Sequence, residues 1–166
     1  MFNKGATVYY ATAGVCKVND ICRSPFNQSD ERMYYVLQPN DSNNGTIIYA
    51  PVENETVVLR PLMTKYEAAE LISSLSDLPL LDIINEKQRR DEYRNAMKLG
   101  TPKSLARVIK TVYNRKKNAV NEKKRFSDTD SEFDKAARHC LFGELSCVLD
   151  ITSDEAEERV FAAIEC

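Results

Sequence analysis

The sequence predicts an α+β protein with two domains: a small five-stranded antiparallel β-barrel over residues 1–62 and an all-α bundle of about five helices over residues 63–166. Two observations support this division. The residues before Thr64 form short β-branched and aromatic runs separated by turn-forming segments, which is typical of strands. After Thr64, apolar residues recur at intervals of three and four, which is the period of a helix. A composition of 43% hydrophobic and 29% charged residues is that of a globular chain.

The expected strands cover residues 6–12, 15–21, 33–38, 46–52 and 56–60. Five short strands in about sixty residues predict a strongly bent barrel, because a flat sheet of this size would leave one face uncovered. Pro51 has no N–H to donate to a neighbouring strand, so we expect it at a strand end or in an edge strand.

The first two helices have recognisable boundaries. Thr64 and Glu67 have the spacing of a capping box, in which two side chains satisfy backbone N–H groups at the start of a helix. Apolar residues follow at helical spacing until residues 76–79 (Ser-Asp-Leu-Pro) end the segment. A second helix is predicted over residues 85–99.

A signal for a helix end and a new helix start follows at residues 100–102. Gly100 suits the left-handed position after a helix, Thr101 is a good N-cap, and Pro102 suits a first helical turn. The third helix is then amphipathic, with an apolar side opposite a cationic side. The apolar side consists of Leu105, Val108, Ile109, Val112 and Ala119, and the opposite side of Lys103, Arg107, Lys110, Asn114 and Lys117.

Two further helices complete the predicted bundle. The fourth has Ser127 as its expected N-cap, and the fifth begins with another capping box, Thr152 and Glu155. The expected apolar residues are Phe133, Ala136, Ala137, Cys140, Leu141, Leu145 and Val148 in the fourth helix and Val160, Phe161 and Ile164 in the fifth.

Charge is segregated along the chain. Residues 87–125 contain 14 lysines and arginines and three acids, a net charge of +11, whereas residues 1–86 carry −5 and residues 126–166 carry −8. A basic block within an acidic chain is typical of a surface that binds nucleic-acid phosphate. The expected contact residues are Lys87, Arg90, Arg94, Lys98, Lys103, Arg107, Lys110, Lys117, Lys123, Lys124 and Arg125.

A basic helix face can also be a simple solvated face. Solvated faces usually alternate Glu with Lys, but no acid lies between Lys103 and Lys117. Because such a stripe repels itself, we favour contact with a polyanion. The chain has no recognition-helix, zinc-finger or RNA-stacking pattern, so we expect salt-dependent contacts to the nucleic-acid backbone rather than base-specific readout.

Enzymatic activity is not expected. The single histidine, His139, is predicted to be a buried or boundary residue of the fourth helix, and the five glycines form no phosphate-binding loop. The five cysteines have neither zinc-site nor disulfide spacing, so we expect reduced thiols, mostly in the core, and no metal or cofactor. Since no signal sequence or membrane span is evident, we expect a cytoplasmic protein. We also expect the chain to be monomeric when free.

Several short segments, spread in a fixed order over nearly the whole chain, form a familiar pattern. They are residues 4–10 (K-G-x-x-V-x-Y), 34–37 (YYVL), 48–54 (IYAPVEN), 57–62 (VVLRPL), Tyr93, 99–102 (LGTP), 105–113 (LARVIKTVY), 114–117 (NRKK) and 142–145 (FGEL). Together they resemble the CarD family of bacterial transcription regulators. The resemblance implies a Tudor-like N-terminal domain that binds the β subunit of RNA polymerase through an exposed strand edge. It also implies a helical domain that contacts promoter DNA at the upstream edge of the melted bubble and stabilises the open complex.

The resemblance also suggests individual contact residues. Family arginines at the polymerase contact fall near Ser24 and Tyr49, so Arg23 is expected to take the place of the first and Tyr49 to supply an aromatic contact. The implied polymerase-binding residues are Arg23, Ile47, Ile48, Tyr49 and Pro51.

The chain lacks the tryptophan that the family commonly places near the start of the second helix, as a wedge against the DNA minor groove. Residues 80–84 (Leu-Leu-Asp-Ile-Ile) occupy the corresponding stretch. Two interpretations stay open: Ile83 or Ile84 is a smaller aliphatic wedge, or both isoleucines pack the helix into the bundle.

A function of a different class is a general RNA- or ribosome-associated binding module. In that case the barrel is only a scaffold, and the chain binds structured RNA without RNA polymerase.

Overall fold

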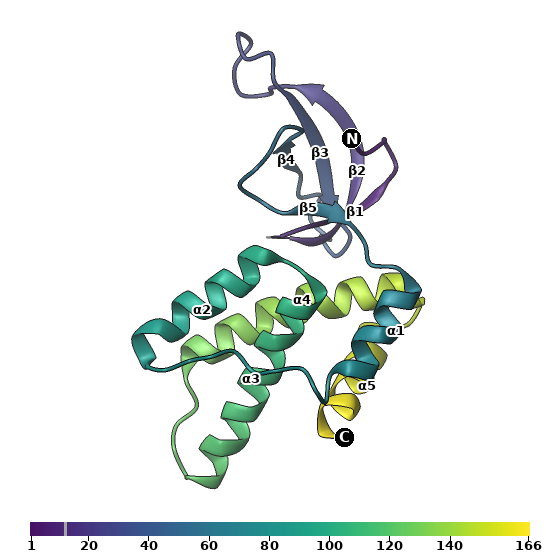
Figure 1. The fold of residues 1–166 in the computed structure, drawn as a ribbon. Coiled ribbons are helices and arrows are strands. Elements are labelled where there is room, and N and C mark those ends of the chain that lie inside the picture. The colour runs from purple at the N-terminus through teal and green to yellow at the C-terminus, as the bar shows by residue number, and fades with distance from the viewer. Residues whose placement is uncertain (12) are drawn as a thin grey trace. The chain divides into compact units, whose positions relative to one another are not determined.

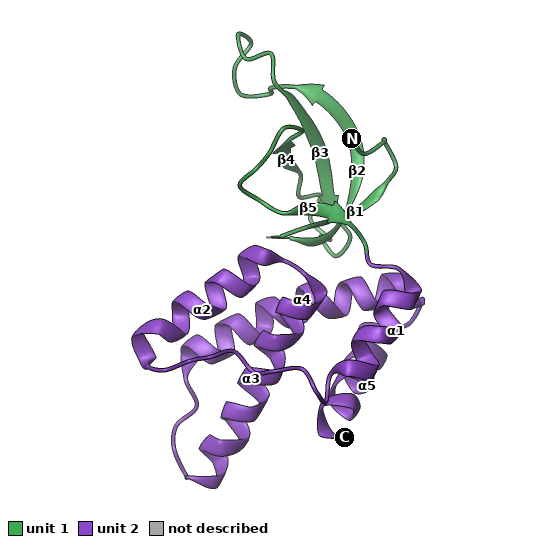
Figure 2. Ribbon diagram, viewed as in Figure 1, with its two compact units in different colours: residues 1–62 green, residues 63–166 purple. Residues whose placement is uncertain are grey.

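The computed structural model of the chain describes residues 1–11 and 13–166. These residues form two compact units, 1–62 and 63–166 (Figure 2). The first unit contains five strands and the second contains five helices, in that order along the chain (Figure 1). The predicted α+β class, with an N-terminal β domain and a C-terminal helical domain, is therefore confirmed.

Unit 1 is an antiparallel sheet with the strand order β4-β3-β2-β1-β5. Within residues 1–11 and 13–62, β4 and β5 are its two edges, so the expected barrel is a sheet whose backbone ladder does not close into a ring. A β-bulge between Val18 and Asp20 shifts the β2–β3 register and bends the sheet. The strand predicted over residues 6–12 extends to Thr12, which lies outside the described residues. The strands are β1 Thr7–Tyr10, β2 Gly14–Arg23, β3 Met33–Pro39, β4 Ile48–Pro51 and β5 Leu59–Pro61.

One face of this sheet carries the core of unit 1. Val8, Val18, Leu37 and Ala50 are completely buried there, because alternate side chains of a strand point to the same face. Pro51 is the last residue of the edge strand β4, as predicted for a residue without an N–H.

The helices of unit 2 begin at the N-cap residues that the sequence predicts. Thr64, Thr101 and Thr152 each accept a hydrogen bond from the backbone N–H three residues later, as N-caps. Gly100 ends α2 with a φ of 59°, the left-handed conformation that glycine adopts without strain. Ser127 is the N-cap residue of α4, although its side chain makes no capping hydrogen bond. The helices are α1 Lys65–Ser74, α2 Glu86–Leu99, α3 Pro102–Asn121, α4 Asp128–Leu149 and α5 Ser153–Glu165.

The apolar side of α3 lies in the core of unit 2. Leu105, Val108, Ile109 and Val112 are almost completely buried, as predicted, whereas Ala119 near the helix end is only half-buried. Burial of four large aliphatic side chains on one helix contributes about 1.5–3 kcal/mol each to folding.

The buried side of α4 differs in part from the predicted stripe. Ala136 and His139 are exposed, so the expectation of a buried or boundary His139 is wrong. With a rotation of about 100° per residue, position 139 falls on the side of the helix opposite Ala137 and Leu141. The buried residues are Asp130, Ala137, Cys140, Leu141, Phe142, Glu144 and Leu145.

All five cysteines are free thiols, but they are not mostly in the core. Cys16 and Cys140 are buried and Cys22 is half-buried, whereas Cys147 and Cys166 are exposed. No helix in the described part of the chain is long and apolar enough to span a membrane.

Candidate functional site

Among the strands of residues 1–11 and 13–62, none pairs with the outer edge of β4, so this edge presents unused backbone groups. The Val52 N–H donates to the Met33 carbonyl at 2.9 Å, which makes this pair a hydrogen-bonded one in the β3–β4 register. In an antiparallel ladder such pairs alternate with pairs that face away from each other. Ala50, opposite Tyr35, therefore bonds to β3, while the N–H and C=O of Tyr49 face outward. An added strand from a partner could bond to them.

An aromatic cluster lies beside this edge. Phe26 packs edge-to-face on both Tyr34 and Tyr49, with ring centroids 5.9 and 5.6 Å apart. Phe26 is 72% exposed and Tyr49 is 38% exposed, so the cluster forms an apolar patch on the surface of unit 1. Ile47, directly before β4, is also exposed.

Phe26 was not among the residues that the sequence suggested. It lies in the polar segment 24–32, where a phenylalanine directly after Pro25 has no strand or helix to support its burial. An isolated aromatic residue in a turn-rich segment was the available signal for its exposure.

Arg23 lies apart from this cluster. It is exposed at the end of β2, where it is paired with Met33 of β3, so it is two strands away from β4. Because cross-strand partners share a face, Arg23 lies on the face that carries Tyr35 and Ala50, opposite Tyr49. The structure thus places Ile47, Ile48, Tyr49 and Pro51 along one segment, whereas Arg23 lies two strands away, on the face opposite Tyr49.

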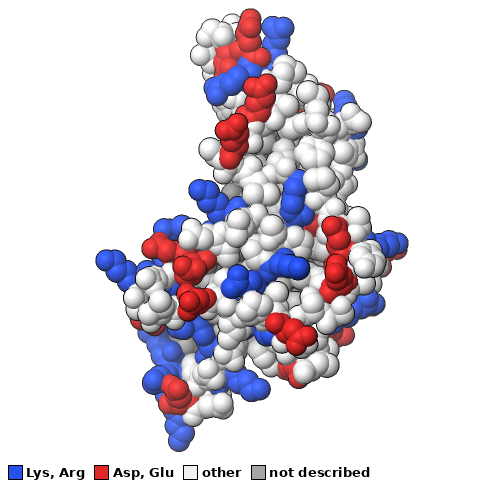
Figure 3. Space-filling model, in the orientation of Figure 1, with Lys and Arg blue, Asp and Glu red and all other residues white. Residues whose placement is uncertain are grey.

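The predicted basic residues of unit 2 fall into groups with different surroundings. Basic side chains gather around the end of α3, with acidic side chains among them (Figure 3). In the described residues, five predicted lysines are exposed and their ammonium groups make no ion pair or hydrogen bond. They are Lys87, Lys98, Lys103, Lys117 and Lys123.

Four other predicted residues make exposed ion pairs. Arg90 lies 3.6 Å from Glu132, and Arg94 lies 3.8 Å from Asp91. The hydrogen bond between Lys124 and Glu122 lowers the pKa of the Glu122 carboxyl and raises the pKa of the Lys124 ammonium. Arg125 pairs with Asp128 at 3.2 Å. Such surface pairs are weak, so a phosphate group can replace the carboxylate.

Arg107 and Lys110, on the predicted cationic side of α3, bind backbone carbonyls instead of solvent. The Lys110 ammonium donates to three carbonyl oxygens between Leu75 and Leu78, at distances of 2.7–2.8 Å. The Arg107 guanidinium donates to the carbonyls of Pro79 and Leu80, both at 3.1 Å. These two cations therefore hold the segment between α1 and α2 against α3.

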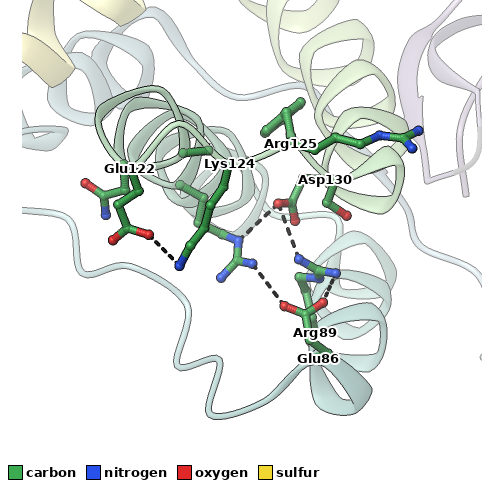
Figure 4. Close-up of a pocket in the computed structure, with 11 residues that line it drawn as sticks. Glu86, Arg89, Glu122, Lys124, Arg125 and Asp130 are labelled. Carbon is green, nitrogen blue, oxygen red and sulfur yellow. Dashed lines mark hydrogen bonds and ion pairs between the residues drawn. The ribbon is translucent and has the colours of Figure 1, made fainter.

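Two further arginines of the basic block belong to a partly buried ionic network (Figure 4). The Asp130 carboxylate, which is 3% exposed, lies 3.5 Å from Arg89 and 3.1 Å from Arg115. It also accepts a hydrogen bond from the Tyr93 hydroxyl at 2.7 Å, and burial together with this bond raises the pKa of Tyr93. Glu86 pairs with both arginines from the other side.

This network lines a polar cavity of about 390 Å³ between α2, α3 and the segment that leads into α4. Arg89 and Arg115 are occupied by carboxylates there, while Arg125 points away from the network (Figure 4). The +11 of the sequence therefore overstates the charge that unit 2 offers to a ligand.

Residues 83 and 84 have different environments. Ile83 is half-buried, whereas Ile84 is 77% exposed immediately before the N-cap of α2, Asn85. Packing into the bundle, one of the two interpretations of these isoleucines, therefore does not describe Ile84. Among residues 1–11 and 13–166, no group of three His, Cys, Asp or Glu side chains could hold a metal ion.

Comparison with protein families matches both halves of the chain. A model described as the CarD-like/TRCF RID domain matches residues 2–63, and one described as the CarD C-terminal domain matches residues 70–161. A search of curated proteins finds no match. The two matches agree in order with the two structural units and cover most of the sequence. The chain therefore belongs to the CarD family of non-enzymatic transcription factors and is a transcription-associated protein that interacts with RNA polymerase.

Proposed function

We propose that unit 1 binds the β subunit of RNA polymerase by adding the partner's strand to β4, and that unit 2 contacts promoter DNA at the upstream edge of the melted bubble. The observation that carries this proposal is the open β4 edge, where the N–H and C=O of Tyr49 face outward beside the exposed Phe26. In strand addition, backbone hydrogen bonds supply affinity and neighbouring side chains supply selectivity.

The DNA contact is assigned first to the five exposed lysines without internal partners. Arg90, Arg94, Lys124 and Arg125 join them when phosphates replace their weakly bound carboxylates. These contacts read the backbone rather than the bases, so affinity falls with salt by about 0.9 log units per log unit of salt for each phosphate neutralised. Such binding is useful when polymerase delivers the protein to a promoter, in the cytoplasm and at the nucleoid.

A protein that binds the open promoter complex more tightly than the closed one shifts the population toward the open form by that difference in affinity. We assign part of this difference to Ile84, acting as an aliphatic wedge at an unstacked base step. Its high exposure means that the side chain has contact area available for DNA.

Ile84→Ala is expected to shorten the lifetime of the open complex about fivefold or more, since burial of this side chain is worth about 1.5–3 kcal/mol. The measurement is the decay of open complexes after competitor addition, with RNA polymerase and the full chain. Val120→Ala is the control matched in exposure, because it truncates an aliphatic residue of α3 that is 70% exposed. An unchanged lifetime with a stably folded Ile84→Ala protein removes Ile84 as the wedge.

The decisive test of the proposed function compares two ligands for the purified chain. We expect binding to the isolated polymerase β subunit and much weaker binding to structured RNA under the same salt conditions. Binding to RNA with no affinity for polymerase would instead support a general RNA- or ribosome-associated module.

A further inference from the structure

The segment between α1 and α2 has no helix or strand over residues 78–84, yet α3 holds it at many points. Lys110 binds the carbonyls of Leu75, Ser76 and Leu78. An ammonium group has three protons, so these carbonyls use all of its donors.

Two neighbours of Lys110 on the same side of α3 continue this attachment. Arg107 binds the next two carbonyls, those of Pro79 and Leu80, through Nε and Nη2. Thr111 Oγ1 accepts a hydrogen bond from the Leu81 N–H at 2.9 Å. Positions 107, 110 and 111 lie three and four residues apart, so their side chains project from one helix face.

The segment is thereby fixed on both sides of the exposed isoleucine. Leu81 is tied to Thr111, and Asn85 caps α2 by accepting a hydrogen bond from the Gln88 N–H at 3.0 Å. Only residues 82–84 lie between these two attachments, and Ile84 is the most exposed large aliphatic residue among them. An anchored span this short restricts the positions that Ile84 can take.

We propose that Lys110, Arg107 and Thr111 are positioning residues for the DNA contact made by residues 80–84, and that Lys110 does not itself bind phosphate. This inference rests on the proposed contact between unit 2 and DNA. Holding the segment in its binding conformation before the encounter removes an ordering cost from binding. In the sequence, the charge of Lys110 indicates phosphate binding, but its three donors are committed to backbone carbonyls. Arg107 uses two of its five N–H donors in this way.

The test measures the binding of the full chain to a short labelled DNA duplex. Fluorescence anisotropy monitors this binding between about 50 and about 200 mM salt. Lys110→Met is expected to weaken binding about tenfold and to leave the slope of log K against log salt unchanged. Lys103→Met and Lys117→Met, the matched variants on the same helix, are expected to reduce the slope by about 0.9 each.

Two further variants separate position from charge. Lys110→Arg keeps the charge but replaces three converging donors with a planar fork, so it is expected to lose affinity as Lys110→Met does. Thr111→Val alters no charge and is expected to weaken DNA binding while the slope stays constant. Faster amide hydrogen exchange at Leu81 in these variants, with unchanged thermal unfolding of the helices, reports release of the segment.

The proposal is overturned if Lys110→Met lowers the salt slope by about 0.9 and Lys110→Arg restores it, because that is the behaviour of a phosphate contact. It is also overturned if Thr111→Val accelerates exchange at Leu81 without any loss of affinity. Failure of the proposed function has a different signature: the wild-type chain and the Lys103 and Lys117 variants would then share one weak affinity.

Discussion

Tyr49→Pro is expected to reduce the affinity of the chain for the polymerase β subunit by about 10- to 100-fold, because one outward backbone donor is removed and a partner carbonyl is left unpaired. The fold should survive the substitution. The Tyr49 N–H faces away from β3, so the ladder within unit 1 loses no hydrogen bond. The measurement is equilibrium binding to the isolated β subunit, with circular dichroism as a check of folding.

Two variants control this experiment. Tyr49→Phe retains both the ring that contacts Phe26 and the backbone N–H, so it is expected to bind polymerase nearly as well as the wild type. Ala50→Pro removes an N–H that faces β3 at a completely buried position, and it is expected to unfold unit 1. Normal polymerase binding by a folded Tyr49→Pro protein would rule out strand addition at β4.

Asp130→Ala is expected to lower the free energy of unfolding of unit 2 by about 3–5 kcal/mol, because it leaves two guanidinium groups without their shared buried carboxylate. Arg89 is largely buried and Arg115 is about two-thirds buried, so water cannot fully replace the lost partner. The Tyr93 hydroxyl also loses its acceptor. Urea unfolding measures the effect, and Glu132→Ala, at an exposed pair with Arg90, should cost less than about 1 kcal/mol.

The same network has a consequence at high pH. Burial and the bond to Asp130 raise the pKa of Tyr93 above its ordinary value of 10.0. The unfolded state then releases the hydroxyl proton first, so stability falls as the pH rises above about 10. Tyr93→Phe removes this contribution. If the variant loses as much stability as the wild type when the pH rises above about 10, the pH dependence belongs to other groups.

Much of the fold could be predicted because its signals are local. The capping boxes at Thr64 and Thr152 and the glycine at position 100 act on backbone groups within four residues of themselves. Alternation along the strands likewise reports the face that each side chain occupies. These features depend little on the rest of the molecule, and the structure confirms them.

The candidate surfaces could be predicted only in part. Exposure of Lys103 and Lys117 follows from the helical period, and it is observed. The same period placed Lys110 beside them, although its ammonium is occupied by carbonyls 32 to 35 residues earlier in the chain. A helical wheel gives the direction of a side chain. It carries no information on which groups of another segment contact that side chain in the folded protein.

The sequence by itself determined the two-domain α+β organisation, the helix boundaries and the concentration of positive charge in residues 87–125, since each depends on near neighbours or on composition. Only the tertiary structure decided how that charge is used. It paired Arg115 with a carboxylate fifteen residues away, tied Lys110 to the segment before α2, and left Ile84 exposed. The physical reason is that an ionic or hydrogen-bonding group takes the partner that chain folding brings within about 3–4 Å, and separation along the chain does not define that partner.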